Sequence, residues 1–197
     1  MNLRESIEIL AIPILMILDY YLTIYGDKLR LEGYSSHFEI DSYELNPLWV
    51  KDVAKHKLFN FKHLSLVFVA ALFVYYLNRT ELDSALYKIL YGALLTNFVL
   101  VNSRHISNIL LFRCLRNNRG HIKGQVKLSE RYVYAQSAIQ YFGCAIIIAP
   151  LALISGSLYI YGALIGCLLL TVAQMAWYRK KREKKIRLYP DVKGSQP

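Results

Sequence analysis

The chain has 197 residues, of which 55% are hydrophobic, and its mean hydropathy is +0.26. This composition argues against a soluble domain, in which long polar stretches flank a single core. The formal net charge of +10 does not indicate nucleic-acid binding, because no recognised nucleic-acid motif accompanies the basic residues.

Apolar runs of about twenty residues, the length needed to cross a bilayer, recur along the whole sequence. We therefore predict an all-α fold, a polytopic membrane helical bundle with about five transmembrane helices and one short interfacial helix. The bundle is expected to occupy residues 1–178. Its predicted spans are residues 7–26, 58–77, 84–112, 131–154 and 158–178.

The first predicted span contains one carboxylate beyond Glu8 at its start. Asp19 lies in an otherwise apolar run, and Thr23 lies one turn further on the same helix face. A carboxylate in the membrane costs about 2.5–3.5 kcal/mol on insertion scales, and it is usually retained only where it faces protein or water. Asp19 therefore indicates a polar site inside the membrane.

Residues 27–60 form a long predicted loop with a short helix in its second half. Asn46 as the cap and Pro47 at the first helical position predict where that helix begins. Its apolar face would lie at the membrane interface, and Lys51, Lys55 and Lys57 would point toward water.

The third predicted span carries the densest polar pattern, and we expect it to continue as one long helix. Asn97, Arg104 and Asn108 share one stripe by spacings of seven and four, and Asn102 and His105 lie three apart on a neighbouring stripe. This helix would present Arg104 and His105 together toward the first span. Arg104 is the expected counter-ion of the carboxylate there, because a buried carboxylate needs a charge partner or a proton.

The last two predicted spans form a hairpin with few polar residues. Gly162 and Gly166 form a Gly-x-x-x-Gly step, which is typical of close helix packing. A weaker alternative is that this face docks another subunit, for example in a homo-oligomer. Three scattered cysteines predict neither a disulfide framework nor a zinc–thiolate site.

The basic residues predict the orientation in the membrane. The tail, residues 179–197, holds eight basic and two acidic residues, which contribute +6 of the net charge of +10. The connection at residues 113–131 is also basic, so the positive-inside rule places both in the cytoplasm. We expect an integral protein of the plasma membrane whose cytoplasmic tail contacts anionic headgroups of the membrane lipids.

On this topology, several reactive side chains converge near the cytoplasmic face. Asp19, His63 and His105 are suitable ligands for a divalent metal such as zinc, manganese or iron, although no short ligand motif is present. Alternatively, Asp19, Glu44 and His105 would act as acid and base on a lipid-like substrate. Arg104 would then bind an anion or a carboxylate.

A different class of function uses the same residues structurally. In a non-enzymatic transporter or membrane scaffold, the polar side chains would form interhelical pairs or bind an ion or proton. The supporting polar residues in either reading are Thr23, Asn46, Asn97, Asn102 and Asn108. The three remaining histidines are expected to be solvated in loops, and they are His37, His56 and His121.

Two short motifs in the first half of the chain resemble a known family. Asp19-x-x-x-Thr23 near the end of the first span, followed by Glu44-x-Asn46-Pro47, is similar to the signature of an uncharacterised prokaryotic integral membrane family. The family has no known function, so the resemblance implies a membrane protein and no activity. This chain departs from the pattern by a long insertion at residues 27–43 and an additional C-terminal hairpin.

Overall fold

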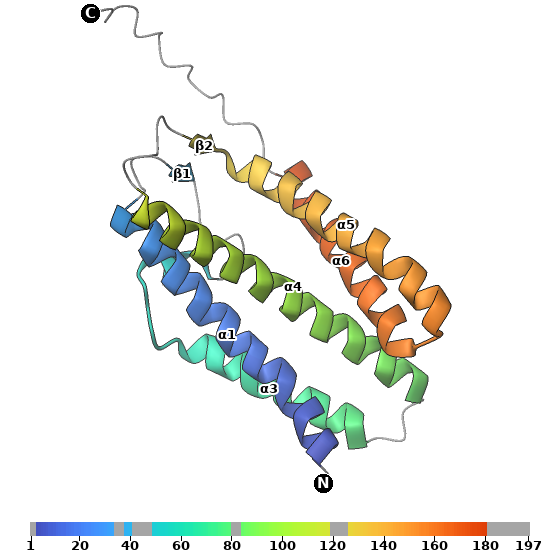
Figure 1. Ribbon diagram of the computed structural model, residues 1–197. Helices are drawn as coiled ribbons and strands as arrows, with labels where there is room; N and C mark the ends of the chain where they lie inside the picture. Colours follow the sequence, from blue (N-terminus) through green and yellow to red (C-terminus); the bar gives the residue numbers. More distant parts are fainter. Residues whose placement is uncertain (1–2, 34–37, 41–48, 80–83, 119–125, 181–197) are drawn as a thin grey trace, which may run out of the picture.

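The fold is an all-α helical bundle. The computed structural model describes residues 3–33, 38–40, 49–79, 84–118 and 126–180, and within them it contains six helices and two three-residue strands (Figure 1). The helices are α1 Leu3–Gly33, α2 Val50–Ala54, α3 Phe61–Arg79, α4 Ser84–Asn117, α5 Glu130–Ser155 and α6 Leu158–Lys180. The strands are β1 Phe38–Ile40 and β2 Val126–Leu128.

Five of these helices are long and apolar enough to cross a membrane. They are α1, α3, α4, α5 and α6, and their apolar side chains are exposed over much of the surface. On α5, for example, Leu153 and Ile154 are 73% and 85% exposed. Helices that are apolar on their outer faces as well as their inner ones belong in lipid. The chain is thus a multi-pass integral membrane protein.

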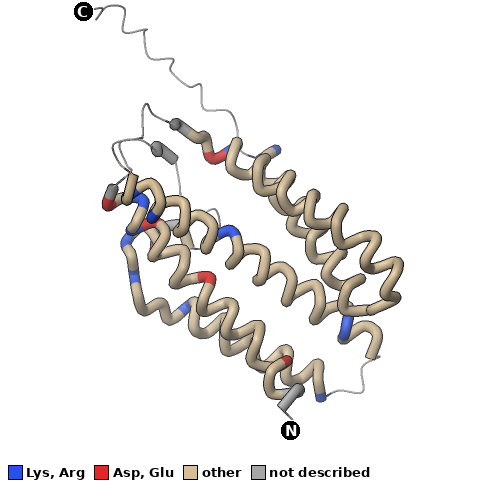
Figure 2. The backbone as a smooth tube through the Cα atoms, in the orientation of Figure 1, with Lys and Arg blue, Asp and Glu red and all other residues tan. Residues whose placement is uncertain are grey.

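The long helices pack side by side with α4 at the centre. Helix α4 packs against α1 on one side and against α6 on the other, α3 packs on α1, and α5 packs on α6 (Figure 1). Charged residues concentrate at the ends of the bundle, and the middle of the bundle is mostly uncharged (Figure 2). Two charges interrupt this middle zone, Asp19 on α1 and Arg104 on α4.

The contact between α4 and α6 depends on three glycines. A β-carbon on Gly166 would lie 2.7 Å from the Ala93 carbonyl oxygen, and β-carbons on Gly92 and Gly162 would likewise meet the backbone of the facing helix. Gly162 and Gly166 thus pack against α4 of the same chain. The predicted alternative, that this face docks another subunit, is wrong because α4 already covers it.

Helix α1 is longer than the predicted span at residues 7–26. It continues to Gly33, into the predicted loop, and side-chain pairs three and four residues apart stabilise the added turns. Arg30 pairs with Asp27 at 2.8 Å, and Lys28 pairs with Glu32 at 3.9 Å.

The short helix α2 lies against α1. Val53 is 2% exposed and packs with Tyr20 and Ile24. Lys51 and Lys55 are exposed, and the described helix begins at Val50. The predicted start at Asn46 and Pro47 lies outside the described residues.

The two strands connect distant loops at one end of the bundle. Strand β1 pairs in parallel with β2, with Phe38 opposite Val126 and Ile40 opposite Leu128. The loop after α1 and the loop after α4 therefore lie at the same end (Figure 1). We call this the strand-bearing end.

Candidate intramembrane site

The Asp19 carboxylate and the His105 imidazole meet between α1 and α4. Oδ1 of Asp19 lies 3.1 Å from Nε2 of His105. The Asp19 side chain is 30% exposed and the His105 side chain is 7% exposed. The two residues, far apart in sequence, thus form a short interhelical contact in which the Asp19 side chain is partly accessible.

Thr23 completes this contact from one turn along α1. Its hydroxyl donates to the Asp19 carbonyl oxygen at 2.8 Å, and Oγ1 lies 3.2 Å from His105 Nε2. Because the single hydroxyl hydrogen is used, Oγ1 accepts from Nε2–H. The imidazole therefore donates to Thr23, and the contact of the same nitrogen with Asp19 Oδ1 is within ion-pair distance but lacks hydrogen-bond geometry. This arrangement does not activate Thr23 as a nucleophile, since no basic ring nitrogen faces its hydroxyl.

Asn102 holds α4 against α1 next to this pair. The side chain is 3% exposed, and Nδ2 donates to the Leu15 carbonyl at 3.0 Å and to the Phe98 carbonyl at 2.7 Å. Asn102 is one turn before His105 on α4, and Leu15 is one turn before Asp19 on α1. The amide therefore fixes the relative position of the two helices where the acid and the imidazole meet.

Arg104 binds a side chain of α5, whereas Asp19 contacts His105, so the prediction that Arg104 is the counter-ion of Asp19 is wrong. Its Nη1 donates to Ser137 Oγ on α5 at 3.0 Å, and its guanidinium lies 6.0 Å from the centre of the Tyr141 ring. Successive residues on a helix point about 100° apart. His105 therefore takes the α1 side of α4 and Arg104 takes the α5 side.

His63 belongs to a separate aromatic cluster between α1 and α3. Its ring stacks on Tyr20 with centroids 4.5 Å apart, and Trp49 meets it edge-on at 5.5 Å. A shallow pocket beside it is lined by Ile17, Tyr20, Tyr21, Leu58, Asn60, His63 and Leu64. In the part of the chain that the structure describes, no three His, Cys, Asp or Glu side chains form a metal-ligating group.

The remaining predicted site residues are dispersed. Asn97 faces α6, where its Oδ1 is buried near Gly166, and Asn108 is half-buried further along α4. Glu44 and Asn46 lie outside the described residues, as do His37, His121 and the tail from Lys181 onward.

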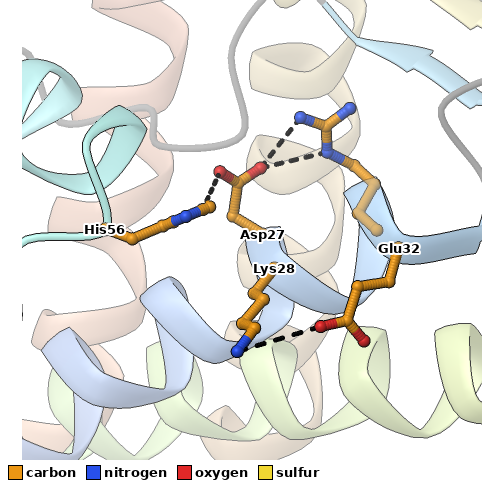
Figure 3. A network of polar contacts seen from close by, with 5 residues as sticks. Asp27, Lys28, Glu32 and His56 are labelled. Atoms are coloured by element: carbon orange, nitrogen blue, oxygen red, sulfur yellow. Dashed lines mark hydrogen bonds and ion pairs between the residues drawn. The ribbon is translucent and has the colours of Figure 1, made fainter.

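A second polar network was not predicted (Figure 3). Asp27 is 5% exposed, and Arg30 binds its Oδ1 through Nε at 3.1 Å and Nη2 at 2.8 Å. His56, expected to be solvated, instead contacts Asp27 Oδ2 at 3.1 Å. The i, i+3 spacing of Asp27 and Arg30 was a local signal for half of this network. Nothing local links Asp27 to His56, which is 29 residues away.

Polar contacts also anchor the segment between α2 and α3. The Tyr20 hydroxyl donates to the Lys57 carbonyl at 2.6 Å, and Asn60 Nδ2 donates to Asp52 at 2.8 Å. Asn60 Oδ1 accepts from the backbone amides of Lys62 and His63, so Asn60 caps the start of α3. Together with the Asp27 network, these contacts hold the strand-bearing end of α1 in place.

Comparisons with known proteins add no relative. No family model matches the chain, and neither the curated proteins nor the solved structures contain a match. The function is therefore inferred from the site itself.

Proposed function

We propose that this membrane protein uses Asp19 and His105 as an acid–base pair that acts on a lipid-like substrate near the cytoplasmic face. The observation that carries the proposal is the 3.1 Å contact between Asp19 Oδ1 and His105 Nε2 inside a membrane bundle. A carboxylate next to an imidazole provides a base and an acid with exchangeable protons, as general acid–base catalysis requires.

The partial exposure of Asp19 supports a reactive role over a purely structural one. A structural ion pair in a membrane is most stable when both groups are enclosed, but the Asp19 side chain is 30% exposed. Leu18, which precedes it, is 40% exposed, and Leu22, one turn further on the same face, is half-buried. A molecule approaching Asp19 along the lipid-facing surface of α1 thus meets apolar side chains around one carboxylate, which suits a lipid-like substrate.

The depth of the pair supports action near a headgroup. Tyr20 follows Asp19 directly, and its ring stacks on His63, the third residue of α3. Asp19 is therefore level with the start of α3, where that helix enters the bundle from the strand-bearing end. The basic connection and tail favour the cytoplasm for this end. The substrate would present its polar part here and its chain to the bilayer.

Metal binding at this pair remains a prediction. Asp19 and His105 supply two ligands, whereas His63 is engaged with Tyr20 and Trp49. Glu44, a third candidate, lies outside the described residues. Metal analysis of purified protein is expected to show the metal in the wild type and its loss in Asp19→Asn and His105→Ala.

The test of the acid–base proposal is lipid turnover by the reconstituted protein. Wild type, Asp19→Asn and His105→Gln are placed in nanodiscs with a cellular lipid extract, and products are identified by mass spectrometry. Losing a general acid or base typically costs about 10²–10⁴-fold in rate, so each variant should be at least roughly 100-fold slower. Glu32→Gln is the matched control, because Glu32 is a 44% exposed carboxylate on the same helix.

The outcomes separate a reactive pair from a structural one. Full turnover by both site variants, or no turnover of any lipid by the wild type, would exclude the proposed chemistry.

A transporter or scaffold is the alternative, and the interhelical bonds of Asn102 and Arg104 favour it for those two residues. In that case the site variants would lose stability, or ion or proton flux through proteoliposomes, in place of turnover.

A further inference from the structure

A polar cluster without an acid lies between α4 and α5 in the part of the chain that the structure describes. Arg104 of α4 donates to Ser137 of α5, and its guanidinium lies over the ring of Tyr141, one turn further along α5. Ser137 and Tyr141 are both 3% exposed, and Arg104 is half-buried. This cluster uses a different face of α4 from His105, about 100° around the helix.

The charge of Arg104 has no carboxylate beside it among the described residues. Asp19, the acidic side chain that the sequence assigned to it, contacts His105 instead. An arginine remains charged in a membrane, and it is commonly retained there by a carboxylate, by carbonyl groups or by a ligand. Within the described residues, its hydrogen-bond acceptor is one hydroxyl.

All three side chains of the cluster have donors to offer. Arg104 has five N–H groups, of which the Nη1 group binds Ser137. Ser137 uses its oxygen to accept that bond, so its own hydrogen is available. The Tyr141 hydroxyl oxygen is buried without a hydrogen-bond partner among the described residues. These donors outnumber the acceptors of the cluster, and no carboxylate is in ion-pair contact with Arg104 among the described residues, so an anion with several oxygens would supply both acceptors and charge.

The cluster lies just inside the aromatic residues that mark the membrane interface. Tyr134 and Trp177 meet at 5.7 Å, and Arg131 contacts the Tyr178 hydroxyl at 3.1 Å, so an aromatic belt surrounds this end of the α5–α6 hairpin. Ser137 is three residues, about 4.5 Å, deeper than Tyr134. An arginine side chain at that depth reaches the headgroup region.

We propose that Arg104, Ser137 and Tyr141 form a binding site for a phosphate-type anion at the α4–α5 seam. The anion is the headgroup phosphate of a membrane lipid or a soluble phosphate compound. The site shares no side chain with the Asp19–His105 pair. Lipid retention tests this proposal and product formation tests the previous one, so either can fail alone.

The experiment measures anion binding to the full chain in two arms. In the first arm, native mass spectrometry follows the retention of phosphatidylglycerol by protein released from micelles. In the second arm, phosphorus NMR titrates inorganic phosphate against protein in neutral detergent. Each arm compares wild type with Arg104→Gln, Tyr141→Phe and Arg113→Gln. Arg113 is the matched control, because its guanidinium also lies over a tyrosine ring, that of Tyr25 at 5.5 Å from the ring centre, but it is exposed.

The expected result is binding that depends on Arg104 and not on Arg113. Arg104→Gln should weaken the apparent affinity by about tenfold or more, since it removes a charge-assisted contact, and Tyr141→Phe should weaken it less. Loss in the first arm alone indicates a lipid, and loss in the second arm indicates a soluble anion. Equal binding by wild type, Arg104→Gln and Tyr141→Phe, or no binding in either arm, would overturn the proposal. If Arg104→Gln does not fold, Tyr141→Phe decides, because it keeps the ring.

Discussion

Two faces of α4 place a charged side chain in different surroundings. Toward α1, Asp19 meets the imidazole of His105, and Asn102 fixes the helices beside them. Toward α5, Arg104 meets a hydroxyl and an aromatic ring, with no acid beside it in the residues described. The first seam, between α1 and α4, contains both the acid and its basic partner and suits proton transfer. The second seam has no acid in contact with its arginine among the described residues and suits a ligand that brings one.

Among the variants that test this comparison, His105→Leu is expected to change the free energy of unfolding most. The variant leaves the Asp19 carboxylate beside an apolar side chain, and breaking a fully buried pair costs about 3–5 kcal/mol. Because Asp19 is 30% exposed, we expect roughly 2–4 kcal/mol less free energy of unfolding. Denaturant titration in mixed micelles measures this difference. The double variant Asp19→Leu/His105→Leu should recover most of the loss, and a single variant as stable as wild type would contradict the pairing.

A smaller loss of stability is expected from Gly166→Ala. This variant disturbs the α4–α6 contact, which positions the α5–α6 hairpin beside α4. The added methyl meets the Ala93 carbonyl and Asn97, so α6 must move away from α4 at a cost of about 1–3 kcal/mol. Gly143→Ala is the control, because a β-carbon added there would meet nothing within 4 Å. That variant should be neutral or up to about 1 kcal/mol more stable, since alanine favours helix. Equal stability of the two variants would show that the close α4–α6 contact is not required.

The smallest effect is expected from Ser137→Ala. Interhelical hydrogen bonds in membrane proteins average about 0.6 kcal/mol, and Arg104 keeps other donors free for its ligand. A double-mutant cycle of Ser137→Ala with Arg104→Gln should therefore give a coupling below about 1 kcal/mol. The corresponding cycle for Asp19 and His105 should give a clearly larger value. Similar couplings at both seams would remove the distinction between them.

The helices were predictable from the sequence because membrane spans need long apolar runs, and the five runs are continuous enough to see. The Asp19–His105 contact could also be predicted as one possibility, because few groups inside the membrane can pair with a carboxylate. The direction of Arg104 could not be predicted from the sequence. Arg104 and His105 are consecutive and point toward different helices, and only the packing of the bundle decides which helix each one faces. The packing role of Gly92 was not predicted, because the group that it contacts is the backbone of another helix. The contact of His56 with Asp27 was not predicted, because the two residues are separated by a loop.

The short pairing of β1 with β2 constrains how the chain crosses the bilayer. Between the two strands the chain runs through α3 and then α4, and both strands lie on the same side. The number of crossings between them must therefore be even. Helix α4 has 34 residues, about 51 Å at 1.5 Å per residue, which exceeds a hydrocarbon core of about 30 Å. If α4 crosses, α3 must cross as well, so α3 cannot be a re-entrant segment that dips in and returns. Six residues of strand thus fix the parity of the membrane path between β1 and β2.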